Sequence, residues 1–406
     1  MTVAPGAADT ETAGFSVYVH VPFCAQKCHY CDFYTVTDPQ GRDPLRSAWL
    51  DLCLAELDLM AAAPPAFAAG IAPLAGPIRT VFLGGGTPSL LPPADFARFI
   101  RGLNERFGLL HGAEITLETQ PGTVVGDDGF AVFAASGINR FSVGVQTFDE
   151  ALLAATGRRH TAGESRAAIR SAATTGAQLS VDLISALPGQ TPARWESDLD
   201  TLLDLAAAIP ALGHVSAYEL TIHPATRWAR DQAAGLRREA TEDDRVTMFR
   251  ATERRLTAAG FDHYEISNHA LPGRRGQHNE AYWRLADVIG LGAGAHTTRW
   301  PRRWRNPDSA REWAAAIATG RLPAVPSETD DPDVFVAENL AMAIRLHDGF
   351  DMDWFATKTG TDLRAGRRAR PLARLVDDGI VEIRDASLRL TPAGRLAADT
   401  VSDRLL

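Results

Sequence analysis

Length and composition place the sequence among large globular proteins. Its 406 residues are 45% hydrophobic and 22% charged, which is enough for a large core and for two or three domains. The formal net charge of −9 weighs against a nucleic-acid partner, because proteins that bind nucleic acids usually present a basic surface.

The N-terminal stretch carries no targeting signal that we can identify. Residues 1–14, which we expect to be flexible, lack the basic start and the apolar core of a signal peptide. No run of about 18 apolar residues predicts a membrane span anywhere in the chain. Three of the four cysteines are clustered, which excludes a disulfide framework, and we predict a cytoplasmic protein.

Strand-like and helical patterns alternate along the first two thirds of the chain. The predicted strands are Ser16–Val21, Thr80–Leu83, Ile115–Glu118, Arg140–Val145, Leu179–Ile184 and Val215–Leu220. Helical patterns occupy residues 45–60, 93–107, 127–136, 163–175, 194–208 and 241–259. This alternation predicts an α/β fold, a partial (β/α)6 barrel with a parallel sheet inside and helices outside. In such barrels the chemistry lies at the carboxyl ends of the strands.

A cysteine cluster follows the first predicted strand. Its members, at spacing Cys-x3-Cys-x2-Cys, are Cys24, Cys28 and Cys31. Thiolates packed this closely indicate an iron–sulfur or a zinc site. Zinc usually takes four ligands, and His20 or His29 could supply the fourth, so both metals stay open at this point. Cys53 lies in a Leu/Ala-rich helical pattern that is typical of a buried structural cysteine.

This spacing, with Tyr30 directly before the third cysteine, resembles the radical S-adenosylmethionine (radical SAM) superfamily. The resemblance implies a [4Fe–4S] cluster whose open iron binds the amino and carboxylate groups of S-adenosylmethionine (SAM). It also implies that an electron passed to the sulfonium can release a 5′-deoxyadenosyl radical, with the protein holding and shielding these cofactors.

Residues at the ends of the other strands are candidates for the SAM site. The run from Gly84 to Ser89, Gly-Gly-Gly-Thr-Pro-Ser, allows close approach of a ligand to bare backbone. Arg158 would pair with the SAM carboxylate, because a guanidinium fork matches that group. By resemblance, the SAM contacts are Tyr18, Tyr30, Gly86, Thr87, Glu118, Gln146, Arg158 and Asp182.

Beyond the sixth strand the pattern changes. Residues 261–268 are predicted to form another strand, and His278 and Tyr282 share a face if their segment is helical. Residues 299–305 are basic and aromatic, which indicates either a solvated surface or a site for propionate or phosphate. From about residue 330 a helical pattern and a hairpin predict a winged-helix-like module, for which the acidic charge favours a structural or lid role. We therefore expect a barrel over 15–235, a closing extension over 236–328 and a C-terminal domain over 329–406.

Two features indicate the branch of the superfamily. The chain resembles the group that contains oxygen-independent coproporphyrinogen III oxidase and the HemW family of heme chaperones. The oxidase has a further cysteine two positions after the third, where this chain has Phe33. The HemW family carries His-Asn-x-x-Tyr-Trp, which here is His278-Asn279-Glu280-Ala281-Tyr282-Trp283. Small departures occur after Glu118, in Thr-Gln-Pro, and at Ile222-His223-Pro224.

The resemblance to HemW implies three cofactors and two protein partners. The cofactors are the [4Fe–4S] cluster, SAM and a heme bound by His278, Tyr282 and Trp283. The partners are a heme-acceptor protein and an electron donor such as flavodoxin or ferredoxin. The alternatives are a coproporphyrinogen III dehydrogenase and, more weakly, a radical enzyme that acts on another substrate such as a nucleic acid.

Overall fold

The computed structural model describes residues 14–65, 68, 71–124, 128–326 and 332–405, so the expected flexible N-terminus lies outside the described residues apart from Gly14. Six parallel strands form the centre of one large sheet: β1 (Phe15–Val21), β4 (Ile78–Gly85), β5 (Leu109–Thr119), β6 (Arg140–Gln146), β7 (Gln178–Ser185) and β8 (Leu212–Glu219). The helices between them are α1 (Trp49–Ala62), α2 (Pro93–Phe107), α3 (Gly129–Ala135), α4 (Glu150–Thr156), α5 (Ala162–Ala173) and α6 (Pro192–Ala208). The predicted partial barrel is confirmed, with α4 as a short helix that the sequence patterns did not indicate.

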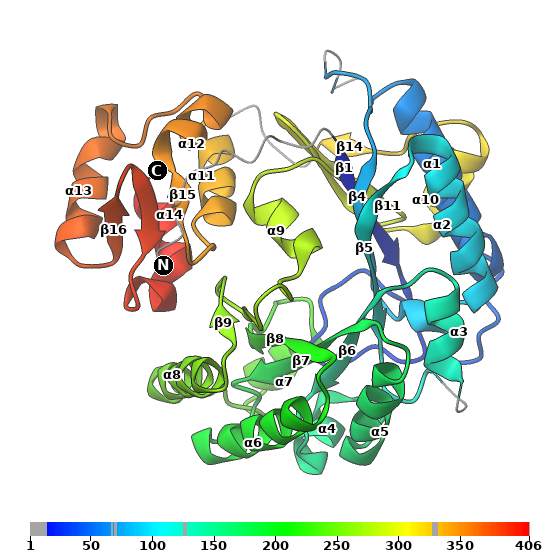
Figure 1. Cartoon of the computed structure of the whole chain (residues 1–406), viewed down its shortest axis with the longest axis horizontal. Helices are drawn as coiled ribbons and strands as arrows, with labels where there is room; N and C mark the ends of the chain where they lie inside the picture. Colours follow the sequence, from blue (N-terminus) through cyan, green and yellow to red (C-terminus); the bar gives the residue numbers. More distant parts are fainter. Residues whose placement is uncertain (1–13, 66–67, 69–70, 125–127, 327–331, 406) are drawn as a thin grey trace.

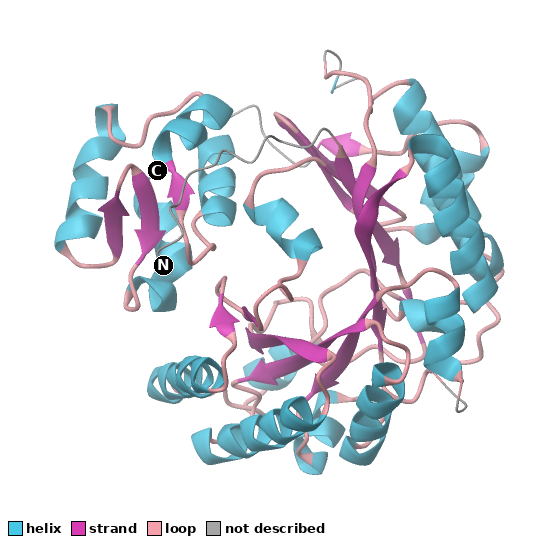
Figure 2. Ribbon diagram, viewed as in Figure 1, coloured by secondary structure: helices cyan, strands magenta, loops and turns pink. Residues whose placement is uncertain are grey.

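The sheet is curved, and its helices cover the convex side (Figures 1 and 2). Alternation along each strand explains this arrangement, because successive side chains point to opposite faces. In β1, Val17, Val19 and Val21 are fully buried in the core that the sheet shares with the helices. Tyr18 and His20, which alternate with them, face the inside of the barrel together with polar residues of the neighbouring strands.

The predicted extension continues the same sheet at both edges. After α7 (Arg227–Ala233) and α8 (Glu242–Ala258), strands β9 (Asp262–His263) and β10 (Asn268–Ala270) join the edge at β8. At the other edge, β11 (Val288–Leu291) runs parallel to β1 and is followed by β12 (His296–Arg299), β13 (Arg302–Arg305), α10 (Ala310–Ala318) and β14 (Val325–Pro326). Strands β2 (Phe23–Cys24) and β3 (Val36–Thr37) pair at the base of the cysteine loop.

The prediction of one strand over 261–268 was wrong, because the chain reverses within it. Strands β9 and β10 are antiparallel neighbours. The turn between them is closed by the Glu265 carboxylate, which accepts a hydrogen bond from the Ser267 backbone N–H at 3.0 Å. A side chain that binds nearby backbone in this way competes with a continuous strand.

The C-terminal module has its own core. It contains α11 (Pro332–Ala343), β15 (Phe350–Asp351), α12 (Met352–Thr359), α13 (Ala369–Asp377), β16 (Val381–Arg384), β17 (Ser387–Leu390) and α14 (Ala398–Leu405), with a three-stranded sheet in the order β15-β17-β16. Leu285 packs in this core, and Ile266 and Trp300 pack against it, so the module is fastened to the barrel by residues of the extension. Within the described ranges, no helix combines the length and the apolar character that crossing a bilayer requires.

Candidate functional site

A cavity of about 480 Å³ opens at the carboxyl ends of the parallel strands. Its size is that of a site for one small organic ligand. All three clustered cysteines and seven of the eight predicted SAM contacts line it: Cys24, Cys28, Cys31, Tyr30, Gly86, Thr87, Glu118, Gln146, Arg158 and Asp182. The eighth, Tyr18, lies outside this lining. It sits in the middle of β1 and packs near Phe82 and His278.

The cysteine loop brings three thiols to the same cavity. Cys24 is buried and accepts a hydrogen bond from the Thr87 hydroxyl at 3.6 Å, while Cys28 and Cys31 are half-buried. Burial raises the pKa of the Cys24 thiol and raises that of Cys31 to about 11, so ligation to a metal must displace their protons. Across the described ranges, no three His, Cys, Asp or Glu side chains are arranged to hold a single metal ion. Three soft ligands around one cavity fit a larger cluster.

The two histidines that could have completed a zinc site are both engaged elsewhere. His29 Nδ1 donates to the Ala155 carbonyl at 3.1 Å, and its Nε2 accepts from Arg227 at 2.9 Å. His20 Nε2 donates to the Tyr34 carbonyl at 2.9 Å, and its Nδ1 lies 3.1 Å from the Tyr18 hydroxyl. His29 therefore anchors the cysteine loop to the end of α4.

The glycine loop after β4 lies against the start of the cysteine loop. The Gly86 N–H donates to the Val21 carbonyl at 2.8 Å, and the Thr87 N–H donates to the Phe23 carbonyl at 2.9 Å. A Cβ at Gly86 would lie 2.7 Å from the Val21 carbonyl oxygen, so any larger residue would force the two loops apart. The glycine is required for this close approach.

Charged groups of both signs face the cavity. Burial, reinforced by Asp182, raises the pKa of Glu118 to about 7, and a hydrogen bond from the Gly85 N–H at 3.0 Å opposes the shift. Burial also raises the pKa of Asp182, which accepts hydrogen bonds of 3.0 and 2.8 Å from the Ser142 hydroxyl. Arg158 Nη2 donates to the Tyr30 hydroxyl at 3.1 Å beside the cysteines. Two carboxylates and a guanidinium that line one cavity suit a ligand that carries an amino-acid group.

Several lining residues were missed by sequence reasoning. Tyr218 and Glu219 end β8 and line the cavity. Their place at the carboxyl end of the sixth predicted strand could have identified them. His223 also lines the cavity, and its Nε2 lies 3.4 Å from the Asp32 carboxylate.

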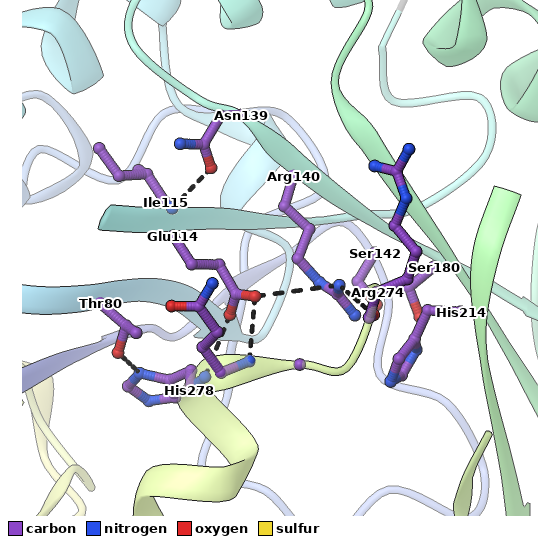
Figure 3. A network of polar contacts seen from close by, with 12 residues as sticks. Thr80, Glu114, Ile115, Asn139, Arg140, Ser142, Ser180, His214, Arg274 and His278 are labelled. Carbon is purple, nitrogen blue, oxygen red and sulfur yellow. Dashed lines mark hydrogen bonds and ion pairs between the residues drawn. The ribbon is translucent and has the colours of Figure 1, made fainter. Parts of the chain in front are cut away.

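The three predicted heme residues lie elsewhere, on helix α9 (Gln277–Trp283), which fills the other end of the barrel. Figure 3 shows how the start of this helix is held. The Glu114 carboxylate accepts hydrogen bonds from the backbone N–H groups of Gln277 and His278 at 3.0 and 3.1 Å. Arg140 lies 3.9 Å from Glu114 and donates to the Arg274 carbonyl at 3.4 Å. A buried carboxylate thus fixes the positive end of a short helix.

His278 is enclosed by this arrangement. Its side chain is 2% exposed, and its ring stacks on Phe82 with centroids 5.2 Å apart. Burial lowers the pKa of His278 to about 3, so the imidazole is neutral. Its Nδ1 contacts Thr80, and its Nε2 is buried without a hydrogen-bond partner among the described residues. Tyr282 lies edge-on to this ring at 5.3 Å, whereas Trp283 lies under the guanidinium of Arg345, which is 4.9 Å from its ring centroid.

Comparison with known proteins identifies the family. The sequence model of the Radical SAM superfamily matches residues 18–202, and that of the HemN C-terminal domain matches residues 330–397. The heme chaperone HemW of Mycobacterium tuberculosis (strain CDC 1551 / Oshkosh) is 34% identical over 404 residues, which cover 99% of this chain and 97% of the relative. The chain belongs to the HemW family.

Other HemW proteins extend this relationship. The one from Synechocystis is 35% identical over 82% of this chain and 78% of its own length, and the one from Escherichia coli is 37% identical over 69% of each. The crystal structure of coproporphyrinogen III oxidase (HemN) from Escherichia coli superposes with a TM-score of 0.78, covers 97% of this chain and 90% of its own, and is 21% identical. It shows that the fold is shared. With membership of the radical SAM superfamily come a [4Fe–4S] cluster and SAM as cofactors, and the cavity has thiols and charged groups that fit both.

Proposed function

We propose that this chain is a heme chaperone that holds a SAM-liganded [4Fe–4S] cluster, binds heme and passes it to an acceptor protein. The observation that carries the proposal is the match to heme chaperones of the HemW family along nearly the whole chain. The identity spans the cysteine loop, helix α9 and the C-terminal module alike, so the proposal concerns the complete arrangement and not one domain.

The residues at the cavity have separate roles in this proposal. Cys24, Cys28 and Cys31 hold the cluster, and Arg158 binds the carboxylate of SAM. Glu118 and Asp182 face the cationic groups of SAM, where buried carboxylates interact strongly because little water screens them. When bound, the cluster and SAM together supply one-electron chemistry. Tyr30 and the glycine loop shield the site from solvent on the side of the cysteine loop.

The heme site is proposed at helix α9. The bare Nε2 of His278 belongs to a neutral imidazole, which is the form that ligates iron. Because this nitrogen is enclosed, heme iron reaches it only after α9 moves away from Thr80 and Glu114. Arg303, on strand β13, opposes the burial that raises the pKa of Tyr282, and it would bind a propionate by exchanging its ion pair with Glu338 at 3.0 Å. The acceptor protein, the flavodoxin or ferredoxin donor and the cytoplasmic location stay predictions.

The oxidase alternative is disfavoured by one position. Phe33, which is 57% exposed at the edge of the cavity, stands where the oxidase has its additional cysteine. The shared fold does not distinguish the two functions, because one fold supports different chemistries.

The test uses anaerobically purified chain with its cluster reconstituted. Heme is titrated in while the Soret band is recorded, and apomyoglobin is then added as a probe for heme release. In parallel, coproporphyrinogen III and SAM are supplied with a reductant. We expect saturable heme binding, release to apomyoglobin and no conversion of coproporphyrinogen III. Conversion to protoporphyrinogen IX by the pure protein would assign it to the oxidase class instead.

A further inference from the structure

Two neighbouring strands end beside the cavity in an unusual backbone conformation. Gln146, the last residue of β6, has φ of 72°, and Ala186, directly after β7, has φ of 60°. The left-handed region is unfavourable for a residue with a side chain, so this conformation persists only where the surroundings enforce it. Gln146 lines the cavity, so its backbone decides where a SAM-facing side chain lies.

The group that enforces the turn after β6 is Asp198, a buried residue of α6. One oxygen of its carboxylate accepts a hydrogen bond from the Phe148 backbone N–H at 2.7 Å. The other accepts from the Thr147 hydroxyl at 2.7 Å. The carboxylate therefore binds the two residues that directly follow Gln146, and it reaches them from the side of the sheet that the helices cover.

The same carboxylate reaches the turn after β7 through one intermediate. The Gln190 side-chain amide donates to Asp198 Oδ2 at 3.3 Å, and its carbonyl accepts from the Leu187 N–H at 3.2 Å. Leu187 follows Ala186 directly. Asp198 is thus connected to both strained strand ends, although it does not line the cavity itself.

We propose that Asp198 is a positioning residue for SAM, which acts by holding the backbone of Gln146 in the conformation that points its side chain into the cavity. This inference rests on the proposed SAM site. The competing explanation is that Asp198 serves only the stability of the fold. Burial raises the pKa of Asp198 to about 6, so the ionised carboxylate is costly at this place, as is common where a charge serves function.

Glu56 provides a matched control for a purely structural carboxylate. It is fully buried on α1 and accepts hydrogen bonds from Gly292 N–H at 2.8 Å, Asn306 Nδ2 at 2.6 Å and Trp313 Nε1 at 3.0 Å. It does not line the cavity. Replacing either carboxylate by its amide disturbs a buried network of similar size, but only the Asp198 network binds the residues that directly follow Gln146.

The experiment measures SAM binding in full-length protein with a reconstituted cluster. Equilibrium dialysis with labelled SAM gives the affinity, and the EPR spectrum of the reduced cluster reports SAM at the open iron. We expect Asp198→Asn to weaken SAM binding about tenfold or more at unchanged iron content, as outer-shell substitutions do. Glu56→Gln should lower the melting temperature and leave SAM affinity unchanged. Wild-type affinity in Asp198→Asn would overturn the inference.

Two further variants keep the test decisive. Thr147→Val removes one hydrogen bond to Asp198 and the acceptor of the Asp149 backbone N–H. If Asp198→Asn does not fold, Thr147→Val should still weaken SAM binding in a folded protein; unchanged affinity overturns the inference. Gln146→Gly accepts the left-handed backbone without strain, so adding Asp198→Asn to it should cost no further SAM affinity. Full additivity would contradict an action through Gln146. A wild-type chain with a complete cluster that binds no SAM would instead overturn the proposed SAM site.

Discussion

His278 Nδ1 lies 2.7 Å from the Thr80 hydroxyl. The same distance separates His214 Nδ1 on β8 from the Ser180 hydroxyl on the neighbouring strand β7. Both imidazoles are 2% exposed inside the barrel, and burial lowers the pKa of each. Only His278 belongs to α9. The two histidines therefore form a matched pair in which burial is equal and the proposed role differs.

This pair gives the first prediction. His278→Ala and His214→Ala should both lower the melting temperature, because each leaves a cavity in the interior. Only His278→Ala should weaken heme binding per folded molecule or shift the Soret band. A heme titration with the folded fraction measured by circular dichroism decides the matter. Equal heme affinity in both variants would show that His278 is not part of the heme site. The heme iron would then take its axial ligand from another residue, and the chaperone function would still stand.

The second prediction concerns the cluster. Replacing Cys24, Cys28 or Cys31 by Ala should abolish the iron–sulfur absorption near ~400 nm, because each thiolate ligates one iron. Cys53→Ala should retain it, since Cys53 is fully buried within α1 and away from the cavity. Iron and sulfide analysis after reconstitution checks both statements. Loss of the cluster in Cys53→Ala would refute the ligation by three cysteines.

The third prediction is a pH dependence of SAM binding. Because the pKa of Glu118 is raised to about 7, the carboxyl is largely neutral at pH 6 and ionised at pH 8. An ionised Glu118 attracts the cationic groups of SAM, so affinity should rise as the pH increases through 7. Glu118→Gln should bind SAM more weakly at pH 8 and lose this rise. A parallel pH profile in wild type and variant would show that another group is responsible.

The fourth prediction is a pH dependence of stability. Burial raises the pKa of Glu56 from 4.5 to about 7, so between these values the folded state binds a proton that the unfolded chain has released. Folding therefore gains stability as the pH falls from 8 toward 5, with about 1 kcal/mol of the gain above pH 6. Denaturant titrations of wild type and Glu56→Gln at several pH values isolate this contribution. The wild type should gain relative to the variant on acidification, and a gain of the opposite sign would contradict the shift.

Sequence reasoning predicted the residues at the carboxyl ends of the strands well, and it predicted the contacts inside the barrel poorly. The three cysteines were named from their local spacing, and the SAM contacts were named by resemblance to the radical SAM superfamily. All three cysteines and seven of those contacts line one cavity. Tyr18 was assigned to SAM by the same resemblance, and within β1 its ring lies 6.4 Å from that of His278 in α9. The chain reversal within residues 261–268 was not predicted, because Glu265 closes the turn through a side-chain contact. The periodicity of hydrophobic residues carries no information on such a contact.

Asp198 and His278 show why the other features of the site could not be predicted from the sequence. Asp198 occurs in an amphipathic helix in which acidic residues usually face water, and only packing against the turn after β6 buries it. His278 was expected to share a face with Tyr282 if their segment was helical, and the segment forms α9. Its enclosure depends on Glu114 and Thr80, which lie 164 and 198 positions earlier in the chain, and no short-range pattern spans such separations.

The packing of the C-terminal module on the extension has a consequence for how the protein can be divided. Trp283 lies under Arg345, and Leu285, Ile266 and Trp300 complete the apolar interior of that module. A chain shortened to end at residue 326 would expose these four side chains to water beside α9. Exposed apolar surface of this kind promotes aggregation. We therefore expect that the barrel with its extension cannot be produced without the C-terminal module. The two parts should be expressed together, and in chimeras with other family members they should be exchanged together.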